Sequence, residues 1–275
     1  MMLGFKPRIN IKKLRDAQLI GWGSKVAIID SGVNNIDNLH IASHKDFVGT
    51  GYHDFFGHGT RVASIVRKLA PGAQIISAKI GDKVPDEVLA MAALEWAIDE
   101  GAKVINISCC FPHKKVCGHK KKYQLCKLVD KIVEVEEILV IVAAGNYGPN
   151  EGTIFCPGCA ENAITVGSVN SSNDKVHEES SRGRIGVNKP NILTTGGVYF
   201  DGSYGWGTSF ATPIIAGIVA ASFNRLKEPD NIRKCLYQST IDLGEPQNHQ
   251  GLGLFSLEKY LEVMGVGEMD SRSQG

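Results

Sequence analysis

The sequence has no strong excess of one charge and no long apolar run. Its 275 residues carry 30 lysines and arginines against 29 aspartates and glutamates, a formal net charge of +1. This balance gives no electrostatic reason to expect a nucleic acid or an acidic membrane surface as a partner. No stretch reaches the ~20 consecutive apolar residues that a membrane span needs. We therefore expect neither nucleic acid nor membrane among the partners.

The N-terminus, residues 1–8, also lacks the apolar run of a secretory signal. The seven cysteines are odd in number and lack the paired spacing of a secreted disulfide framework. Both features favour a cytoplasmic protein with reduced thiols. A chain from which a signal and a propeptide had been removed would have the same N-terminus, so that alternative stays open.

The length and the order of the apolar runs predict a single domain over residues 1–275, with 1–23 as a lead-in segment and 266–275 as a disordered tail. Continuous apolar runs, typical of strands buried in a parallel sheet, occur at 25–29, 74–79, 103–108, 138–144 and 163–169. Helical patterns are expected at 58–69, 86–100, 123–137, 208–224 and 230–238. This alternation predicts an α/β fold, a three-layer α/β/α sandwich with a mainly parallel central sheet.

Three polar residues stand at the ends of predicted elements. Asp30 follows the strand at 25–29, and His58, in Gly-His-Gly-Thr, opens a helical pattern. Ser209 lies in Gly-Thr-Ser-Phe-Ala-Thr-Pro (207–213), which runs into another helix. Taken alone, Ser209 or its neighbour Thr208 would be interpreted as a helix cap. Together the three supply an acid, a base and a nucleophile in the order Asp, His, Ser, which is one of the known orders of a catalytic triad.

At these three stretches the sequence resembles the subtilisin-like serine proteases (subtilases), whose motifs it matches with few departures. The resemblance implies a subtilisin-like fold and a serine endopeptidase that forms an acyl-enzyme on Ser209, with His58 as the base and Asp30 orienting it. It also implies an oxyanion hole formed by the Ser209 N–H and the side chain of Asn146, and a peptide or protein as substrate. An exposed loop asparagine is the alternative interpretation of Asn146.

The resemblance further indicates which residues bind substrate: Ser108, Cys109, Cys110, Gly145, Phe155 and Phe210. Family members usually carry Ser-Leu-Gly at 108–110, so Cys110 adds bulk to one wall of the pocket for the residue before the scissile bond. Phe155 falls where the family places the floor of that pocket, often a glycine, and Phe210 replaces the usual methionine after the nucleophile. We therefore expect a small residue before the scissile bond. The alternative is that Phe155 turns into the core and leaves the pocket open.

We expect no cofactor and no metal. In the family a calcium-binding loop often follows the histidine helix, but residues 69–73 leave no room for it. The insertion at 111–122 could bind zinc through Cys117, His119, Cys126 and one of Cys109 or Cys110. The irregular spacing of these residues favours a solvated basic loop instead.

The Cys-Pro-Gly-Cys stretch at 156–159 has the spacing of a redox pair, but no thioredoxin-like context surrounds it. We therefore expect both cysteines to be structural. The resemblance also implies a cis peptide bond between Cys156 and Pro157.

Three functional hypotheses remain. The leading one is an active endopeptidase of narrow specificity. The second is a catalytically idle binding module with the subtilase fold, against which the four filled catalytic positions count. The third is a dedicated processing protease that cuts one partner or precursor. The sequence indicates neither the substrate nor the oligomeric state.

Overall fold

The computed structural model describes residues 3–5, 9–35, 39–113, 123–200 and 202–266. These residues form a nine-stranded sheet in the order β11-β12-β8-β7-β6-β5-β2-β4-β3, parallel throughout except between β11 and β12. Its strands are β2 (Lys25–Asp30), β3 (Ile41–Asp46), β4 (Gln74–Lys79), β5 (Val104–Ile107), β6 (Leu139–Ala143), β7 (Ile164–Val169), β8 (Ile192–Thr195), β11 (Thr240–Ile241) and β12 (Leu254–Phe255). A small antiparallel sheet joins β1 (Leu3–Phe5), β9 (Val198–Phe200) and β10 (Ser203–Gly205).

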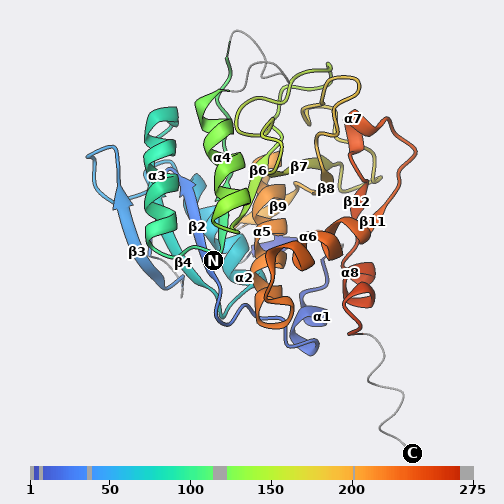
Figure 1. Cartoon of the computed structure of the whole chain (residues 1–275), viewed down its shortest axis with the longest axis horizontal. Helices are drawn as coiled ribbons and strands as arrows, with labels where there is room; N and C mark the ends of the chain where they lie inside the picture. The colour runs from blue at the N-terminus through green and yellow to red at the C-terminus, as the bar shows by residue number, and fades with distance from the viewer. Residues whose placement is uncertain (1–2, 6–8, 36–38, 114–122, 201, 267–275) are drawn as a thin grey trace, which may run out of the picture.

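Helices cover both faces of the large sheet (Figure 1), as the alternating buried residues of β2 show. Val26 and Ile28 pack in one apolar cluster with α2 (His58–Leu69) and α5 (Thr208–Leu226). Ala27 and Ile29 pack in a second cluster with α3 (Glu87–Asp99) and α4 (Gln124–Val135). The other helices are α1 (Ile11–Asp16), α6 (Pro229–Gln238), α7 (Gln247–Gln250) and α8 (Leu257–Val263). The predicted three-layer α/β/α sandwich is thereby confirmed.

Helix α5 runs through the interior and packs closely on α2. By length and composition it could cross a membrane, yet 78% of the apolar 18-residue stretch within it is buried inside the protein. At Gly217 an added Cβ would lie 2.7 Å from Cβ of Leu69 in α2, a distance that carbon atoms do not tolerate. Glycine at 217 therefore allows the two helices to approach.

The ends of these elements place the predicted catalytic residues on one edge of the sheet. Parallel strands β2, β5 and β6 end at Asp30, Ile107 and Ala143, and helices α2 and α5 begin at His58 and Thr208. The predicted strands and the helices at 86–100, 123–137, 208–224 and 230–238 are confirmed, with ends that differ by at most two residues. The half-exposed edge strand β3 and the short strands β8 to β12 were not predicted.

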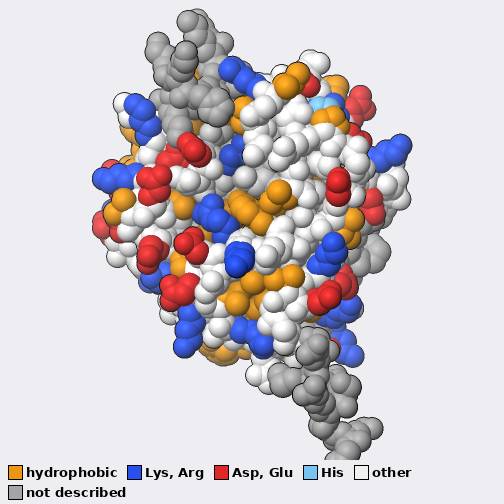
Figure 2. Space-filling view, turned by 45° about the vertical axis from the view of Figure 1, so that its right-hand side comes forward, with side chains coloured by type: hydrophobic (Ala, Val, Ile, Leu, Met, Phe, Trp, Pro, Cys, Tyr) orange, Lys and Arg blue, Asp and Glu red, His pale blue; other side chains and the backbone are white. Residues whose placement is uncertain are grey.

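On the face drawn in Figure 2, acidic and basic side chains are interspersed rather than separated by sign. This distribution agrees with the near-zero net charge of the chain. Residues 267–275 of the predicted tail lie outside the described residues. So do Cys117 and His119 of the predicted basic loop.

Candidate active site

Asp30 and His58 form a hydrogen-bonded pair at the carboxyl end of β2. Nδ1 of His58 lies 2.8 Å from Oδ1 of Asp30. The carboxylate is 6% exposed, and the same Oδ1 atom accepts a hydrogen bond from the Ser31 backbone N–H at 2.8 Å. Because a carboxylate only accepts, Nδ1 carries the proton and Nε2 keeps its lone pair. The structure thus brings the predicted acid and base together in the form that general-base catalysis needs.

A second buried carboxylate, Asp54, fixes the start of α2 around His58. Its Oδ2 accepts hydrogen bonds from Thr60 N at 2.8 Å and from Thr60 Oγ1 at 2.6 Å. Its Oδ1 accepts from Gly57 N at 2.7 Å and from the hydroxyl of Ser31 at 2.8 Å. Asp54 therefore caps the helix that carries the base and ties it to the strand that carries the acid. This role of Asp54 was not predicted from the sequence. The only indication there is that Asp54 lies four residues before His58.

The surroundings of His58 raise its pKa above the ordinary value of 6.5. Burial acts to lower the pKa, because it disfavours the imidazolium. The charge and the hydrogen bond of Asp30, with the charge of Asp54, outweigh burial and the opposing charge of Arg61. The site therefore favours the imidazolium that forms when His58 takes a proton.

The side chain of Asn146 is held in one orientation by Thr208, the first residue of α5. Oδ1 of Asn146 accepts hydrogen bonds from Thr208 N at 3.0 Å and from Thr208 Oγ1 at 2.9 Å. Oγ1 of Thr208 also accepts from Gly145 N at 3.1 Å. Both partners donate, so the atom that accepts from them is the amide oxygen, and the amide nitrogen Nδ2 lies on the other side of the side chain, away from Thr208. Asn146 is exposed but fixed, unlike an ordinary loop asparagine.

Gly207 shows where Nδ2 of Asn146 points. A Cβ added to Gly207 would lie 3.2 Å from Nδ2 of Asn146 and 3.2 Å from Oγ of Ser209. Both polar atoms therefore face one small space, which is open because residue 207 has no side chain. Such a space, beside a hydroxyl and an amide donor at a helix N-terminus, suits a carbonyl oxygen that gains negative charge.

One cleft of about 200 Å³ collects these residues. Its lining includes Asp30, His58, Asn146 and Ser209, together with Ser108 and Cys109 after β5. Phe56 and the loop between β4 and α3, through Gly81, Asp82, Lys83 and Pro85, complete the wall. The sequence had not indicated this last loop.

The residues predicted to shape the specificity pocket lie beside one another next to this cleft. Sγ of Cys110 would be 3.6 Å from a Cβ at Gly145, and the thiol hydrogen-bonds the hydroxyl of Tyr147. The ring of Tyr147 meets the half-buried ring of Phe155 edge to face, with centroids 5.1 Å apart. Burial raises the pKa of Cys110 to about 11, so its thiol is neutral at neutral pH. Tyr147 was not predicted.

Phe210 packs its ring against the imidazole of His58. It is 6% exposed, belongs to the cluster around α5, and its ring centroid lies 5.5 Å from that of His58. Phe56 stacks on the imidazole at 6.0 Å. Phe210 therefore contacts the histidine directly, and its predicted role in substrate binding stays a prediction.

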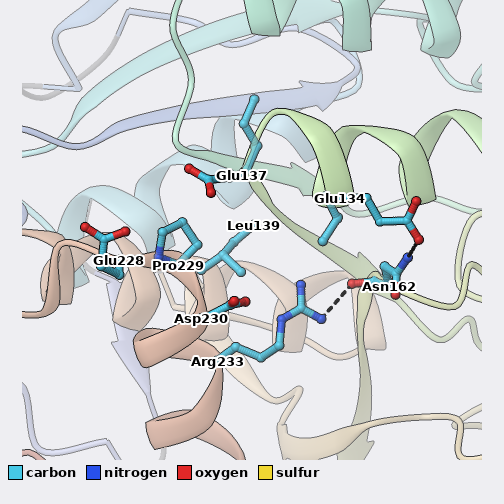
Figure 3. Close-up of a pocket in the computed structure, with 10 residues that line it drawn as sticks. Glu134, Glu137, Leu139, Asn162, Glu228, Pro229, Asp230 and Arg233 are labelled. Atoms are coloured by element: carbon cyan, nitrogen blue, oxygen red, sulfur yellow. Dashed lines mark hydrogen bonds between the residues drawn. The ribbon is translucent and has the colours of Figure 1, made fainter.

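A second and larger hollow, about 360 Å³, lies between α4 and α6 (Figure 3). Acidic side chains surround it: Glu134, Glu137, Glu228 and Asp230. Arg233 donates to the backbone oxygen of Asn162 at 2.8 Å, and Nδ2 of Asn162 donates to Glu134 at 2.7 Å. Among the described residues that line it there is no serine, histidine or cysteine, so this lining differs in chemistry from that of the cleft.

The sequence was compared with known protein families and with known proteins, and both comparisons indicate the same family. The sequence profile described as the subtilase family matches residues 21–254. Subtilisin E from Bacillus subtilis (strain 168) is 32% identical over 274 residues, which cover 91% of this chain and 69% of that protein. The thermostable alkaline protease of Halalkalibacterium halodurans is 29% identical over 257 residues, which cover 86% of this chain and 68% of that protein.

Solved structures share the fold. The prenylagaramide maturation protease PagA superposes with a TM-score of 0.75 at 21% identity, over 92% of this chain and 98% of its own. A lanthipeptide protease superposes with a TM-score of 0.74 at 20% identity, over 96% of this chain and 100% of its own.

Proposed function

Because the chain belongs to the subtilase family of serine proteases, we propose that it is an endopeptidase that cleaves its substrate through an acyl-enzyme on Ser209. The observation that carries the proposal is the shared cleft: the Asp30–His58 pair and the oriented amide of Asn146 line it together with Ser209.

The chemistry follows from these positions. Nε2 of His58 takes the proton of Ser209 as Oγ attacks the scissile carbonyl carbon. The oxygen of that carbonyl becomes negative and accepts hydrogen bonds from Nδ2 of Asn146 and from the Ser209 N–H. When the carbon–nitrogen bond breaks, His58 returns the proton to the leaving amine. A water molecule, deprotonated by the same imidazole, then hydrolyses the ester and frees Ser209.

The proposal includes narrow specificity, with a small residue before the scissile bond. Two contacts support this part of the proposal, because they gather bulky side chains beside the cleft: the hydrogen bond between Cys110 and Tyr147, and the ring contact between Tyr147 and Phe155. A dedicated processing role fits such a restricted pocket. PagA is a maturation protease, but its likeness to this chain extends only to the fold. We further propose a cytoplasmic location, which the unpaired cysteine pattern of the sequence supports.

A fluorophosphonate probe tests the proposal in one experiment, because it labels only a serine that a base has activated. We expect labelling of the wild-type chain, loss of labelling in Ser209→Ala and in His58→Ala, and folded protein in both variants by circular dichroism. Absence of labelling in the wild type would favour the idle binding module. Cleavage of a peptide library would then separate a broad enzyme from a dedicated one.

A further inference from the structure

Three cysteines that are far apart in the sequence meet outside the catalytic cleft. Sγ of Cys126, in the first turn of α4, lies 2.7 Å from Sγ of Cys156 and 3.5 Å from Sγ of Cys159. Cys126 and Cys156 are fully buried, and Cys159 is half-buried. The turn at 156–159, closed by a hydrogen bond from Ala160 N to Pro157 O at 2.9 Å, presents both of its cysteines to α4.

A histidine and a glutamate adjoin one of these thiols, that of Cys156. One ligand atom each from His113, Glu87 and Cys156 lies within 4.8 Å of the others. Nε2 of His113 is buried and 3.3 Å from Oε2 of Glu87, and it makes no hydrogen bond among the described residues. The imidazole is held by stacking on Tyr123, with centroids 3.6 Å apart and planes 13° from parallel. An oriented imidazole nitrogen with no hydrogen-bond partner among the described residues thus stands beside the thiol of Cys156, which in turn adjoins Cys126.

We propose that this cluster binds one structural zinc ion through Cys126, Cys156, Cys159 and His113. Three sulfurs and one imidazole nitrogen are a common donor set of structural zinc, and thiolates select zinc over calcium or magnesium. Tetrahedral zinc with bonds of ~2.0–2.3 Å separates its donor atoms by roughly 3.5–3.8 Å. The Cys126–Cys159 distance already meets that requirement. The Cys126–Cys156 distance must widen by about 1 Å, which a small side-chain rotation provides.

The charge around the cluster suits this ion. Three thiolates and one Zn²⁺ carry a net charge of −1. Buried Lys189 lies close enough for its charge to interact with Asp130, Cys159 and Cys126. Within the described residues its Nζ donates to neutral oxygens, such as Ala163 O at 2.6 Å. Burial lowers the pKa of Lys189 to about 7, and the zinc centre would stabilise its ammonium form.

The zinc would join three segments near the predicted specificity residues: the segment after β5 that carries His113, the turn at 156–159, and α4. Phe111 N donates to Cys156 O at 2.7 Å, so the segment after β5 already pairs with the cysteine turn. Phe155 directly precedes that turn. α3, which begins with Glu87, and α4, which carries Cys126, lie side by side over the same face of the sheet (Figure 1). The ion would therefore fix the pocket floor to α4 without touching the reacting atoms.

Metal content of the purified full chain tests the proposal independently of protease activity. We expect one zinc per chain, and replacement by Co²⁺ should give the visible absorption of tetrahedral cobalt with thiolate charge-transfer bands. Cys126→Ser, Cys159→Ser and His113→Ala should lose the metal or bind it more than tenfold more weakly. Cys235→Ser, a half-buried cysteine on α6, is the matched control and should keep it. The double variant Cys117→Ser/His119→Ala should also keep it.

The cobalt spectrum of the wild type reports thiolate ligation without any substitution. It therefore tests the proposal even where a cysteine variant does not fold. Glu87→Gln should fold and weaken zinc binding by about tenfold, as expected of a carboxylate next to a ligand. Wild-type protein that contains no zinc and gives no cobalt spectrum would overturn the proposal. So would a Cys126–Cys156 disulfide in a non-reduced digest, or zinc that persists in Cys126→Ser and Cys159→Ser.

Discussion

Thr208 holds the side chain of Asn146 with two donors, because its backbone N–H and its hydroxyl both bond to Oδ1 of Asn146, at 3.0 and 2.9 Å. Ser209, the predicted nucleophile, is the next residue in the chain. The turn that starts α5 therefore aligns the predicted oxyanion donor and presents the predicted nucleophile together.

We predict that Thr208→Val lowers kcat about tenfold with little change in KM, because the valine keeps the shape but loses one of the two donors that orient Asn146. Thr208→Ser should restore most of the rate. Loss of the amide itself in Asn146→Ala should lower kcat by about 10²–10³-fold, a magnitude known from subtilisin, a member of the same family. A Thr208→Val enzyme with wild-type kcat would contradict this role of Thr208.

The pH–rate profile should have its acidic limb above the ordinary histidine pKa of 6.5. His58 must be neutral to accept the proton of Ser209, and its pKa is raised, so activity falls as the pH drops through that raised value. Asp54→Asn removes one of the charges that raise the pKa and should shift the acidic limb to lower pH. Asp82→Asn, in the same cleft but not among the main charges that act on His58, should shift the limb less than Asp54→Asn does. If the limb does not move in Asp54→Asn, the electrostatic role of Asp54 is wrong.

Gly207→Ala should lose about 10²-fold or more in kcat/KM, and it should also lower the midpoint of thermal unfolding, because φ of residue 207 is +155°, which residues with a side chain rarely adopt. The new methyl group would lie 3.2 Å from both Nδ2 of Asn146 and Oγ of Ser209, in the space proposed for the carbonyl oxygen. A displacement of about 1 Å of the reacting carbonyl has an effect of this size. The measurements are steady-state kinetics and thermal unfolding; a variant with normal kinetics would show that the oxygen binds elsewhere.

Phe155→Gly should change the preference for the residue before the scissile bond. In peptides that differ only at that residue, the wild type should favour Ala over Leu and Phe, and the variant should gain both larger residues. Forcing extra methylene groups into packed space costs roughly 1–3 kcal/mol, enough for a tenfold preference. Tyr147→Phe, which keeps the ring against Phe155, should retain the preference for Ala. A wild type that already prefers Phe would place the pocket floor elsewhere.

Gly217→Ala should destabilise the protein although alanine is the better helix former. Helix propensity favours Ala over Gly by about 1 kcal/mol. The added Cβ would lie 2.7 Å from Cβ of Leu69, however, and neither carbon is at the end of a flexible chain. Overpacking of about 1–3 kcal/mol should therefore dominate. The check is the midpoint of guanidinium unfolding; a higher midpoint than wild type would mean that α2 and α5 can separate easily.

The strands buried on both faces and the meeting of Asp30, His58 and Ser209 at one cleft were predictable, because apolar runs and short motifs carry that information locally. Asp54, Thr208 and Tyr147 were not, since their roles depend on atoms that only the folded chain brings near. Asp54 illustrates the point: one ordinary acidic residue bonds four donors from two elements. The cysteine cluster was hidden for the same reason, because Cys126 and Cys156 are 30 residues apart. The single-domain prediction and the roles assigned to the specificity residues stay predictions.

The burial of α5 also has a consequence during synthesis of the chain. Residues 208–226 cover the face of the sheet to which β5, β6, β7 and β8 contribute, and they leave the ribosome after all of those strands. Until then that face has no helix α5 to exclude water from Val104, Leu139 and Ile164. Ser209 lies in the first turn of the same helix, so the predicted nucleophile takes its place in the cleft only when α5 has docked and covered this face of the core.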